Sequence, residues 1–140
     1  LYERFDTSIQ CTVVFRVVTG AGGGMPCVLV VEDEPMIAIL LKEWLDELGH
    51  ETVGPVSSVA DGVKMAGAGT FDAALLDINL GAQRSDPIAK ILVERKIPFA
   101  FMTGGSSDSV GECFAALPKL MKPFDFQALT ATLDTLLGRP

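Results

Sequence analysis

The sequence predicts a doubly wound α/β domain in which five parallel strands alternate with five helices. Residues 28–31 and 73–76 are short, continuous apolar runs rich in Val, Leu and Ala, and each run ends at a carboxylate. Runs of this length and composition are typical of parallel strands that are buried on both faces. Segments with helical spacing separate the runs, and such alternation favours a parallel sheet covered by helices on both sides.

Helix-capping and helix-breaking residues mark the ends of the predicted helices. Pro35 suits a first helical turn and Gly49 a helix stop, while Ser58, Ser85 and Asp125 are expected to occupy N-caps. Strands are predicted at about 27–31, 52–56, 73–77, 98–102 and 119–121, and helices at about 35–48, 59–66, 85–95, from Ser107 or Asp108 onward, and 126–137.

Composition narrows the class of protein. The chain has 140 residues, 49% of them hydrophobic, which suits one domain with a substantial core. Its net charge of -7 disfavours non-specific nucleic-acid binding, which depends on neutralising phosphates. No apolar stretch is long enough to span a membrane, and no secretory signal opens the chain. Cys11, Cys27 and Cys113 lack metal-site spacing, so we interpret them as reduced thiols of a cytoplasmic protein.

Residues 1–24 are interpreted as an N-terminal extension and residues 25–140 as the main domain. The extension holds a strand-like run, 11–18, followed by a glycine-rich stretch, 21–24. The alternative is an ordinary extra strand. Because an exposed strand readily adds to a sheet edge, we expect the extension to contact a neighbouring molecule.

Four charged side chains follow predicted strands and should converge at one edge of the sheet. Glu32 and Asp33 follow the first strand, Asp77 ends the third, and Lys122 follows the fifth. Ligands of such sheets bind just beyond the carboxyl ends of the strands. Crowded carboxylates repel one another and invite a hard cation, so this pattern favours phosphoryl chemistry on an aspartate.

Asp77 is the candidate nucleophile, because an unpaired charge at the end of an apolar run is costly without a function. The alternative, a carboxylate that caps the next helix, is disfavoured because Ser85 is expected to cap it. For Mg²⁺, we expect Asp33 and Asp77 as direct ligands and Glu32 acting through water, and the main-chain carbonyl of Asn79 completes the set.

Lys122 and Thr103 are the candidate partners of phosphoryl oxygens. A lysine ammonium is a mobile point charge, and a threonine hydroxyl can donate to such an oxygen. The alternatives are a solvated loop lysine and an ordinary β-branched strand residue. His50, the only histidine, is expected to be exposed and incidental, so the phosphate would come from another molecule.

Taken together, residues 26–137 resemble the receiver domain of two-component response regulators, the CheY-like fold. The resemblance rests on the acidic pair after the first strand, Asp77 after the third, Thr103 after the fourth and Lys122-Pro123 after the fifth. It implies a flavodoxin-like sheet with strand order 2-1-3-4-5 and a receiver domain at 25–140. It also implies phosphorylation of Asp77 by a histidine kinase or histidine phosphotransfer protein, with Mg²⁺ required.

A narrower resemblance is to the single-domain FATGUY-type receivers, and residues 77–81, 85–89 and 97–104 carry it. Typical receivers have an aromatic switch residue three positions before the lysine, where this chain has Lys119. The usual coupling of a rotating threonine to an inward-swinging ring therefore cannot operate here, and this subfamily shares that absence.

The resemblance implies a stand-alone bacterial phosphoacceptor that signals through a downstream protein or drains phosphate from a kinase. It is not expected to be an enzyme beyond its own phosphorylation and slow autodephosphorylation, nor to bind nucleic acid or membranes. The N-terminal extension and the face around the last two helices are candidate homodimer contacts.

Two alternatives stay open. One is a Mg²⁺-dependent aspartyl-phosphate phosphatase, disfavoured because Asn79 stands where such enzymes usually carry a second carboxylate. The other is a phosphorylation-independent scaffold.

Overall fold

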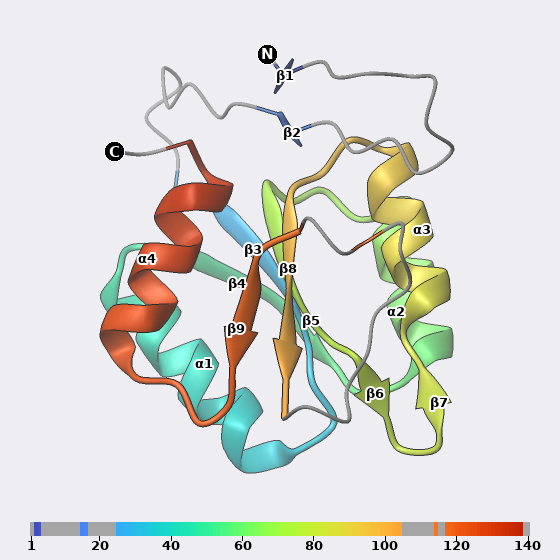
Figure 1. The fold of residues 1–140 in the computed structure, drawn as a ribbon, viewed down its shortest axis with the longest axis horizontal. Coiled ribbons are helices and arrows are strands. Elements are labelled where there is room, and N and C mark those ends of the chain that lie inside the picture. Colours follow the sequence, from blue (N-terminus) through green and yellow to red (C-terminus); the bar gives the residue numbers. More distant parts are fainter. Residues whose placement is uncertain (1, 4–14, 17–24, 105–113, 115–116, 139–140) are drawn as a thin grey trace.

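Five parallel strands form the main sheet of the domain (Figure 1), in the spatial order β4-β3-β5-β8-β9. The computed structural model describes residues 2–3, 15–16, 25–104, 114 and 117–138. In their order along the chain the five strands are arranged 2-1-3-4-5, so the predicted fold class and strand order are confirmed. The strands are β3 (Cys27–Val31), β4 (Glu51–Val56), β5 (Ala73–Asp77), β8 (Phe99–Thr103) and β9 (Lys119–Met121).

Helices cover both faces of the sheet, α1 and α4 on one side and α2 and α3 on the other (Figure 1). Their bounds are α1 (Pro35–Glu47), α2 (Val59–Ala68), α3 (Asp86–Glu94) and α4 (Phe126–Leu136). None of these described helices combines the length and the hydrophobicity that crossing a bilayer requires. The helix predicted from Ser107 or Asp108 lies outside the described residues.

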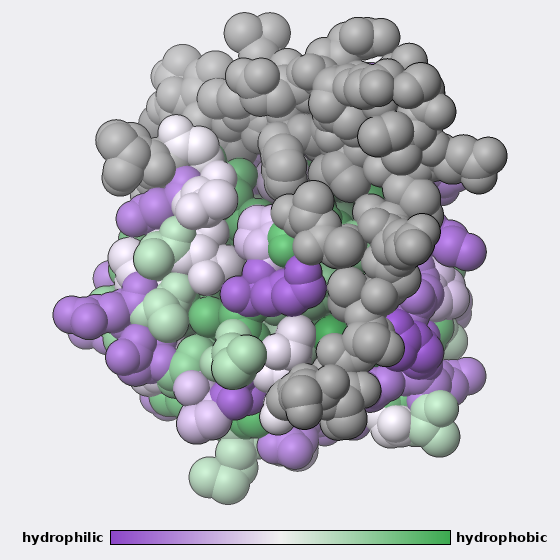
Figure 2. Space-filling model, viewed as in Figure 1, coloured by the Kyte–Doolittle hydropathy of each residue, from purple (hydrophilic) through white to green (hydrophobic). Residues whose placement is uncertain are grey.

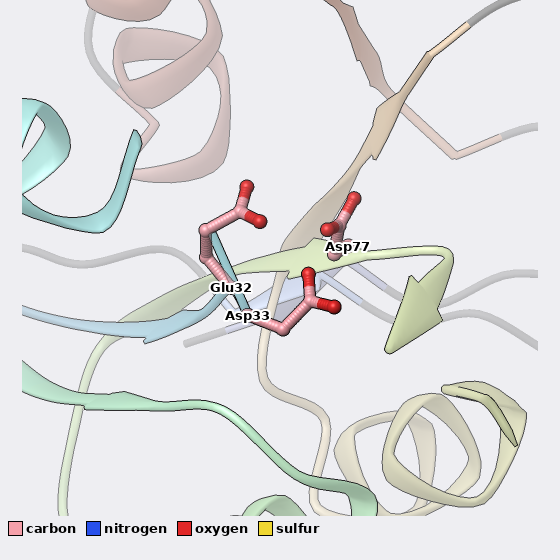
Figure 3. Close-up of side chains that lie close together, drawn as sticks. All are labelled: Glu32, Asp33 and Asp77. Atoms are coloured by element: carbon pink, nitrogen blue, oxygen red, sulfur yellow. The ribbon is translucent and has the colours of Figure 1, made fainter. Parts of the chain in front are cut away.

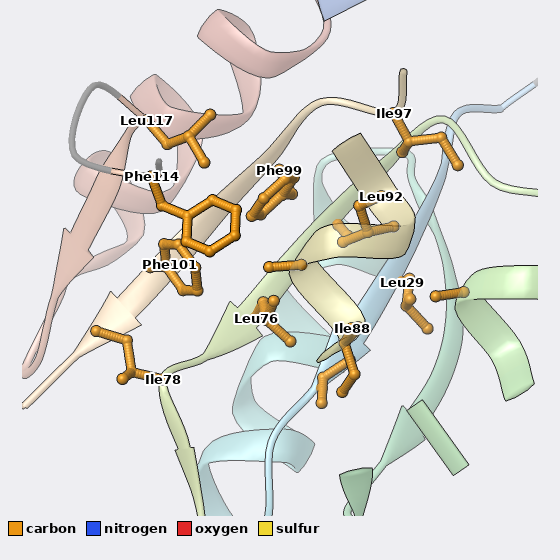
Figure 4. Close-up of a cluster of buried hydrophobic side chains, with 14 of the residues drawn as sticks. Leu29, Leu76, Ile78, Ile88, Leu92, Ile97, Phe99, Phe101, Phe114 and Leu117 are labelled. Atoms are coloured by element: carbon orange, nitrogen blue, oxygen red, sulfur yellow. The ribbon is translucent and has the colours of Figure 1, made fainter. Parts of the chain in front are cut away.

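The continuous apolar strands supply two separate cores. In β3, Leu29 and Val31 pack in the cluster under α2 and α3, whereas Val28 and Val30 pack in the cluster under α1 and α4. This alternation explains why the strand is apolar at every position. Phe99 and Phe101 of β8 meet Phe114 in edge-on ring contacts within the first cluster (Figure 4).

The predicted helix ends are largely confirmed. The Ser58 hydroxyl accepts a hydrogen bond from the Asp61 N–H at 3.1 Å, and Asp125 accepts one from the Ala128 N–H at 2.7 Å. Helix α1 begins at Pro35, and the chain leaves it through Gly49, whose φ of 82° lies in the left-handed region that glycine tolerates.

His50 is only 3% exposed, so the expectation that it lies on the surface was wrong. The turn at Gly49 carries the chain back toward α1, and the His50 N–H donates to the carbonyl of Leu45 at 2.8 Å. A helix stop in the sequence therefore did not mean exposure for the residue after it, because the following strand β4 begins at once.

Two small strand pairs accompany the main sheet. Strands β1 (Tyr2–Glu3) and β2 (Phe15–Arg16) pair antiparallel, and β2 falls inside the strand-like run predicted at 11–18, whose other residues lie outside the described part. Contact of this extension with a neighbouring molecule stays a prediction. Strands β6 (Asn79–Leu80) and β7 (Gln83–Arg84) form a hairpin that the sequence analysis did not anticipate.

Candidate functional site at the carboxyl edge of the sheet

Parallel pairing brings the predicted site residues to one edge of the sheet. Val31 pairs with Leu76, so Glu32, just after β3, and Asp77, the last residue of β5, follow as neighbours. On the other side, Asp77 pairs with Met102 of β8, and Thr103 pairs with Met121 of β9, directly before Lys122. Residues separated along the chain by up to 90 positions thus meet because each one ends a strand.

Three carboxylates form the centre of the site. Glu32, Asp33 and Asp77 each offer an oxygen, and these atoms all lie within 4.8 Å of one another (Figure 3). Glu32 is 2% exposed and Asp77 is 8% exposed, while Asp33 is half-buried. Burying like charges this close is unfavourable without a compensating cation, so the arrangement favours binding of positive charge.

Lys122 supplies one such charge from the protein itself. Its Nζ lies 2.8 Å from Glu32 Oε1 and donates a hydrogen bond to Asp77 Oδ1 at 3.1 Å. Although burial alone would lower it, the pKa of Lys122 is raised by pairing with these two carboxylates. The lysine main chain is fixed as well, because its N–H donates to the Thr103 carbonyl at 2.7 Å.

Asp77 is electrostatically strained among these groups. Burial, followed by the hydrogen bond and charge of Glu32, raises its pKa from 3.8 to about 8, and Lys122 opposes the rise. Perturbed carboxylates of this kind cluster at functional sites, because the fold retains them against their electrostatic cost.

Thr103 ends β8 with a side chain that is 5% exposed, and the exposed Gly104 follows it. The main-chain bond to Lys122 places threonine and lysine on adjacent strands at the same edge. The next residue, Gly105, lies outside the described residues.

Asn79 is the first residue of β6, and its side chain is exposed. The hairpin that carries it is nevertheless connected to the site, because the Gly81 N–H donates to Asp33 Oδ2 at 2.9 Å. At its base, Ser85 donates from both its N–H and its hydroxyl to the Ile78 carbonyl, at 2.9 and 3.0 Å.

The expected capping role of Ser85 was therefore wrong in its chemistry, although the residue does occupy the N-cap position of α3. Its side chain forms no cap hydrogen bond to that helix and turns to Ile78 instead. The glycine at position 81, with a φ of 63°, was the available sequence signal for a hairpin turn here.

An apolar groove of about 340 Å³ opens beside the site and was not foreseen either. It is lined by Ile37 and Leu40 of α1, by Gly104, and by Lys122, Pro123 and Phe124. Near it, Met36 and Ile39 of α1 are exposed. On the face shown in Figure 2, hydrophobic residues are otherwise interspersed with hydrophilic ones.

Comparison with known proteins agrees with this geometry. The family model of the response regulator receiver domain matches residues 28–134. The transcriptional regulatory protein TcrA of Mycobacterium tuberculosis is 35% identical over 135 residues, covering 86% of this chain and 52% of TcrA. The phyllosphere-induced regulator PhyR of Methylorubrum extorquens is 32% identical over 79 residues, covering 54% of this chain and 30% of PhyR. The chain thus spans about half the length of TcrA, and the match covers less of PhyR.

Two solved structures are similar over most of the chain. The solution structure of SdrG from Sphingomonas melonis Fr1 shares 44% identity with a TM-score of 0.73, covering 81% of this chain and 97% of SdrG. The receiver domain of the sensor histidine kinase PA1611 from Pseudomonas aeruginosa, solved with a magnesium ion in its active-site cleft, has a TM-score of 0.71. It shares 24% identity over 82% of this chain and 99% of that domain, a likeness that shows the fold alone.

Proposed function

The chain belongs to the response regulator receiver domain family, and on this premise we propose that it accepts a phosphoryl group on Asp77 from a phosphohistidine of another protein. One observation carries the proposal: the buried Asp77 carboxylate shares the Lys122 ammonium with a second buried carboxylate, Glu32, at 3.1 and 2.8 Å from Nζ. A purely structural role would have left this carboxylate paired with the lysine alone.

The chemistry follows from the positions of these groups. An Asp77 oxygen attacks the phosphorus, and the bond from phosphorus to the histidine nitrogen breaks, its electron pair leaving with the imidazole. Lys122, already 3.1 Å from the carboxylate, provides positive charge for a phosphoryl oxygen as negative charge develops there. Thr103 donates its hydroxyl to another phosphoryl oxygen.

The donor set fits Mg²⁺, because it offers three carboxylates close together at an edge that also carries main-chain carbonyls. Asp33 and Asp77 would hold the ion directly, Glu32 through water, and the Asn79 carbonyl would complete the set. When bound, the ion neutralises charge on the phosphoryl oxygens. The magnesium-bound receiver of PA1611 supports this choice of cation.

The phosphodonor would be a histidine kinase or a histidine phosphotransfer protein. The phosphorylated domain would then signal by binding a protein partner, or it would act by draining phosphate from the kinase. The match that covers 97% of SdrG supports one receiver domain at 25–140, preceded in this sequence by the segment 1–24. Lys119 is exposed on β9 at the position of the usual switch aromatic, so the output would not use an inward-swinging ring. The proposal also includes a cytoplasmic location and no catalytic turnover of a substrate. A homodimer would form through the extension or the face around the last two helices.

Mass spectrometry after treatment with acetyl phosphate tests the central step. We expect the intact protein to gain the mass of one phosphate in Mg²⁺ and much less in chelator, with the modification on the peptide that contains Asp77. Unmodified protein under conditions that phosphorylate another receiver would overturn the proposal. Sustained hydrolysis of a phosphomonoester that is lost in Asp77→Asn would favour the phosphatase alternative instead.

A further inference from the structure

The segment between Asp77 and α3 is a hairpin anchored at two points. At its base, two hydrogen bonds from Ser85 converge on one carbonyl, that of Ile78. At its tip, the Gly81 N–H bonds to the Asp33 carboxylate, which belongs to the loop after β3. The eight-residue connection 78–85 is therefore held both at its own base and to the acidic site.

The register of the hairpin sets the direction of the Asn79 carbonyl. Leu80 pairs with Gln83 next to a two-residue turn, and Ser85 bonds to Ile78 at the base. Hydrogen-bonded and non-hydrogen-bonded pairs alternate in an antiparallel ladder, so Asn79 and Arg84 between them form a non-hydrogen-bonded pair. The main-chain N–H and C=O of Asn79 therefore point away from β7.

The same alternation places the Gly81 N–H on the outward edge of β6 together with the Asn79 carbonyl. Because the Gly81 N–H reaches Asp33, this outward edge is the one that faces the acidic residues. The Asn79 carbonyl and one oxygen of Asp33 are thus oriented by a single short strand.

Ser85 is the residue that holds this strand in register. Its side chain is completely buried, and its hydroxyl adds a second donor to the Ile78 carbonyl, on the residue between Asp77 and Asn79. Ser58, in the equivalent position before α2, uses its hydroxyl to cap the helix instead. Helix α3 thus forgoes a side-chain cap, and the hydroxyl orients the chain beside the site.

We propose that Ser85 is a positioning residue of the divalent cation site: it fixes the Ile78 peptide, so that the Asn79 carbonyl and the Gly81 N–H face Asp33. This inference rests on the proposed function, since it assumes that the acidic site binds Mg²⁺. It assigns a contribution to cation affinity to a residue that supplies no ligand atom.

Calorimetric titration with Mg²⁺ tests the inference. We expect Ser85→Ala to weaken Mg²⁺ binding by about 10-fold or more, as is typical when a group that orients a ligand is lost. Ser58→Ala is the matched control, because it removes a serine hydroxyl that caps α2 instead of bonding to the hairpin, so it should leave Mg²⁺ affinity unchanged. Ser85→Cys fills the site with a slightly larger side chain whose thiol is a weak donor, so it should also weaken binding. It replaces the alanine variant if that one does not fold.

Amide hydrogen exchange gives a second readout that general destabilisation would not mimic. The Gly81 amide should exchange faster in Ser85→Ala than in wild type, and not in Ser58→Ala. Mg²⁺ affinity within twofold of wild type in the folded Ser85 variants would overturn this inference while leaving phosphorylation of Asp77 intact. Wild-type protein that binds no Mg²⁺ would instead overturn the proposed function itself.

Discussion

Two aspartates lie at opposite ends of strand β5, Asp72 just before it and Asp77 at its last position, and their surroundings differ in kind. The Asp72 carboxylate accepts a hydrogen bond from the Cys27 N–H at 2.8 Å, and the Asp72 N–H donates to the Cys27 carbonyl at 2.7 Å. Asp77 instead faces another carboxylate, Glu32, and shares the Lys122 ammonium with it.

The difference shows how a carboxylate with a structural role can be distinguished from one with a role in the reaction at the two ends of one strand. The Cys27 N–H donates to the Asp72 carboxylate and ties β3 to the start of β5, so its charge has a local reason to be there. Asp77 is packed where its own charge is disfavoured, and removing that charge should relieve the fold. Position along a strand thus decides the role, since only the carboxyl end collects the other charged residues.

The sharpest way to break this comparison is the same substitution at both ends. We expect Asp77→Asn to abolish phosphate incorporation from acetyl phosphate, because an amide oxygen is not a nucleophile of carboxylate strength. Asp72→Asn changes the net charge equally and keeps an oxygen for the Cys27 N–H, so its phosphorylation should match wild type. Intact-mass measurements in Mg²⁺ give both results, and a loss of phosphorylation in both variants would contradict the distinction.

The second test concerns the cation that Asp77 has and Asp72 lacks. Lys122→Met leaves two buried carboxylates without their protein cation, which should lower the free energy of unfolding by about 3 kcal/mol. Lys42→Met is the matched control. Its ion pair with Asp46 is exposed, with N and O 3.7 Å apart, and its loss should cost less than about 1 kcal/mol. Urea unfolding in chelator measures both, and equal losses would show that Lys122 is not an essential counter-charge.

The third test uses pH. Burial beside Glu32 raises the pKa of Asp77 from its ordinary 3.8 to about 8 in the folded protein. Between these two pH values the folded state therefore retains a proton that the unfolded chain has lost. Stability from this group is therefore fully present below about pH 4 and is lost as pH rises toward 8. In Mg²⁺-free buffer, wild type should lose stability across this window relative to Asp77→Asn, whereas Asp72→Asn should follow the wild-type curve. A wild-type curve that rises relative to Asp77→Asn would contradict the assigned direction.

The sequence could predict those features of the fold and the site whose physical causes lie close together in the chain. Glu32 and Asp77 were found because each stands at the end of a continuous apolar run, and Lys122 because Lys122-Pro123 follows the predicted fifth strand. Parallel strands must end at the same edge, so these residues were expected to meet. Strands β6 and β7 have two residues each, too short for any periodic pattern, so their hairpin was missed.

The other wrong predictions concern side chains whose partners and burial are determined by the tertiary structure. The Ser85 hydroxyl could cap α3 or bond to Ile78, and only the fold decides between these acceptors. His50 follows a helix stop, which suggested exposure, but the immediate start of β4 buries it. The groove beside Lys122 joins α1 to the segment after β9, and no local pattern connects elements so far apart in the sequence.

The smallest expected effect concerns Asp72 alone. Asp72→Ala removes the acceptor of the Cys27 N–H and leaves that half-buried donor without its side-chain partner, which should cost about 1 kcal/mol. Phosphorylation should be unchanged, because the whole length of β5 separates this bond from the site. Urea unfolding and intact-mass analysis of the same preparation check both statements. If the variant lost phosphorylation without a large loss of stability, a change in the pairing of β3 with β5 at Asp72 would have altered the position of Asp77. The two ends of β5 could then no longer be treated as independent.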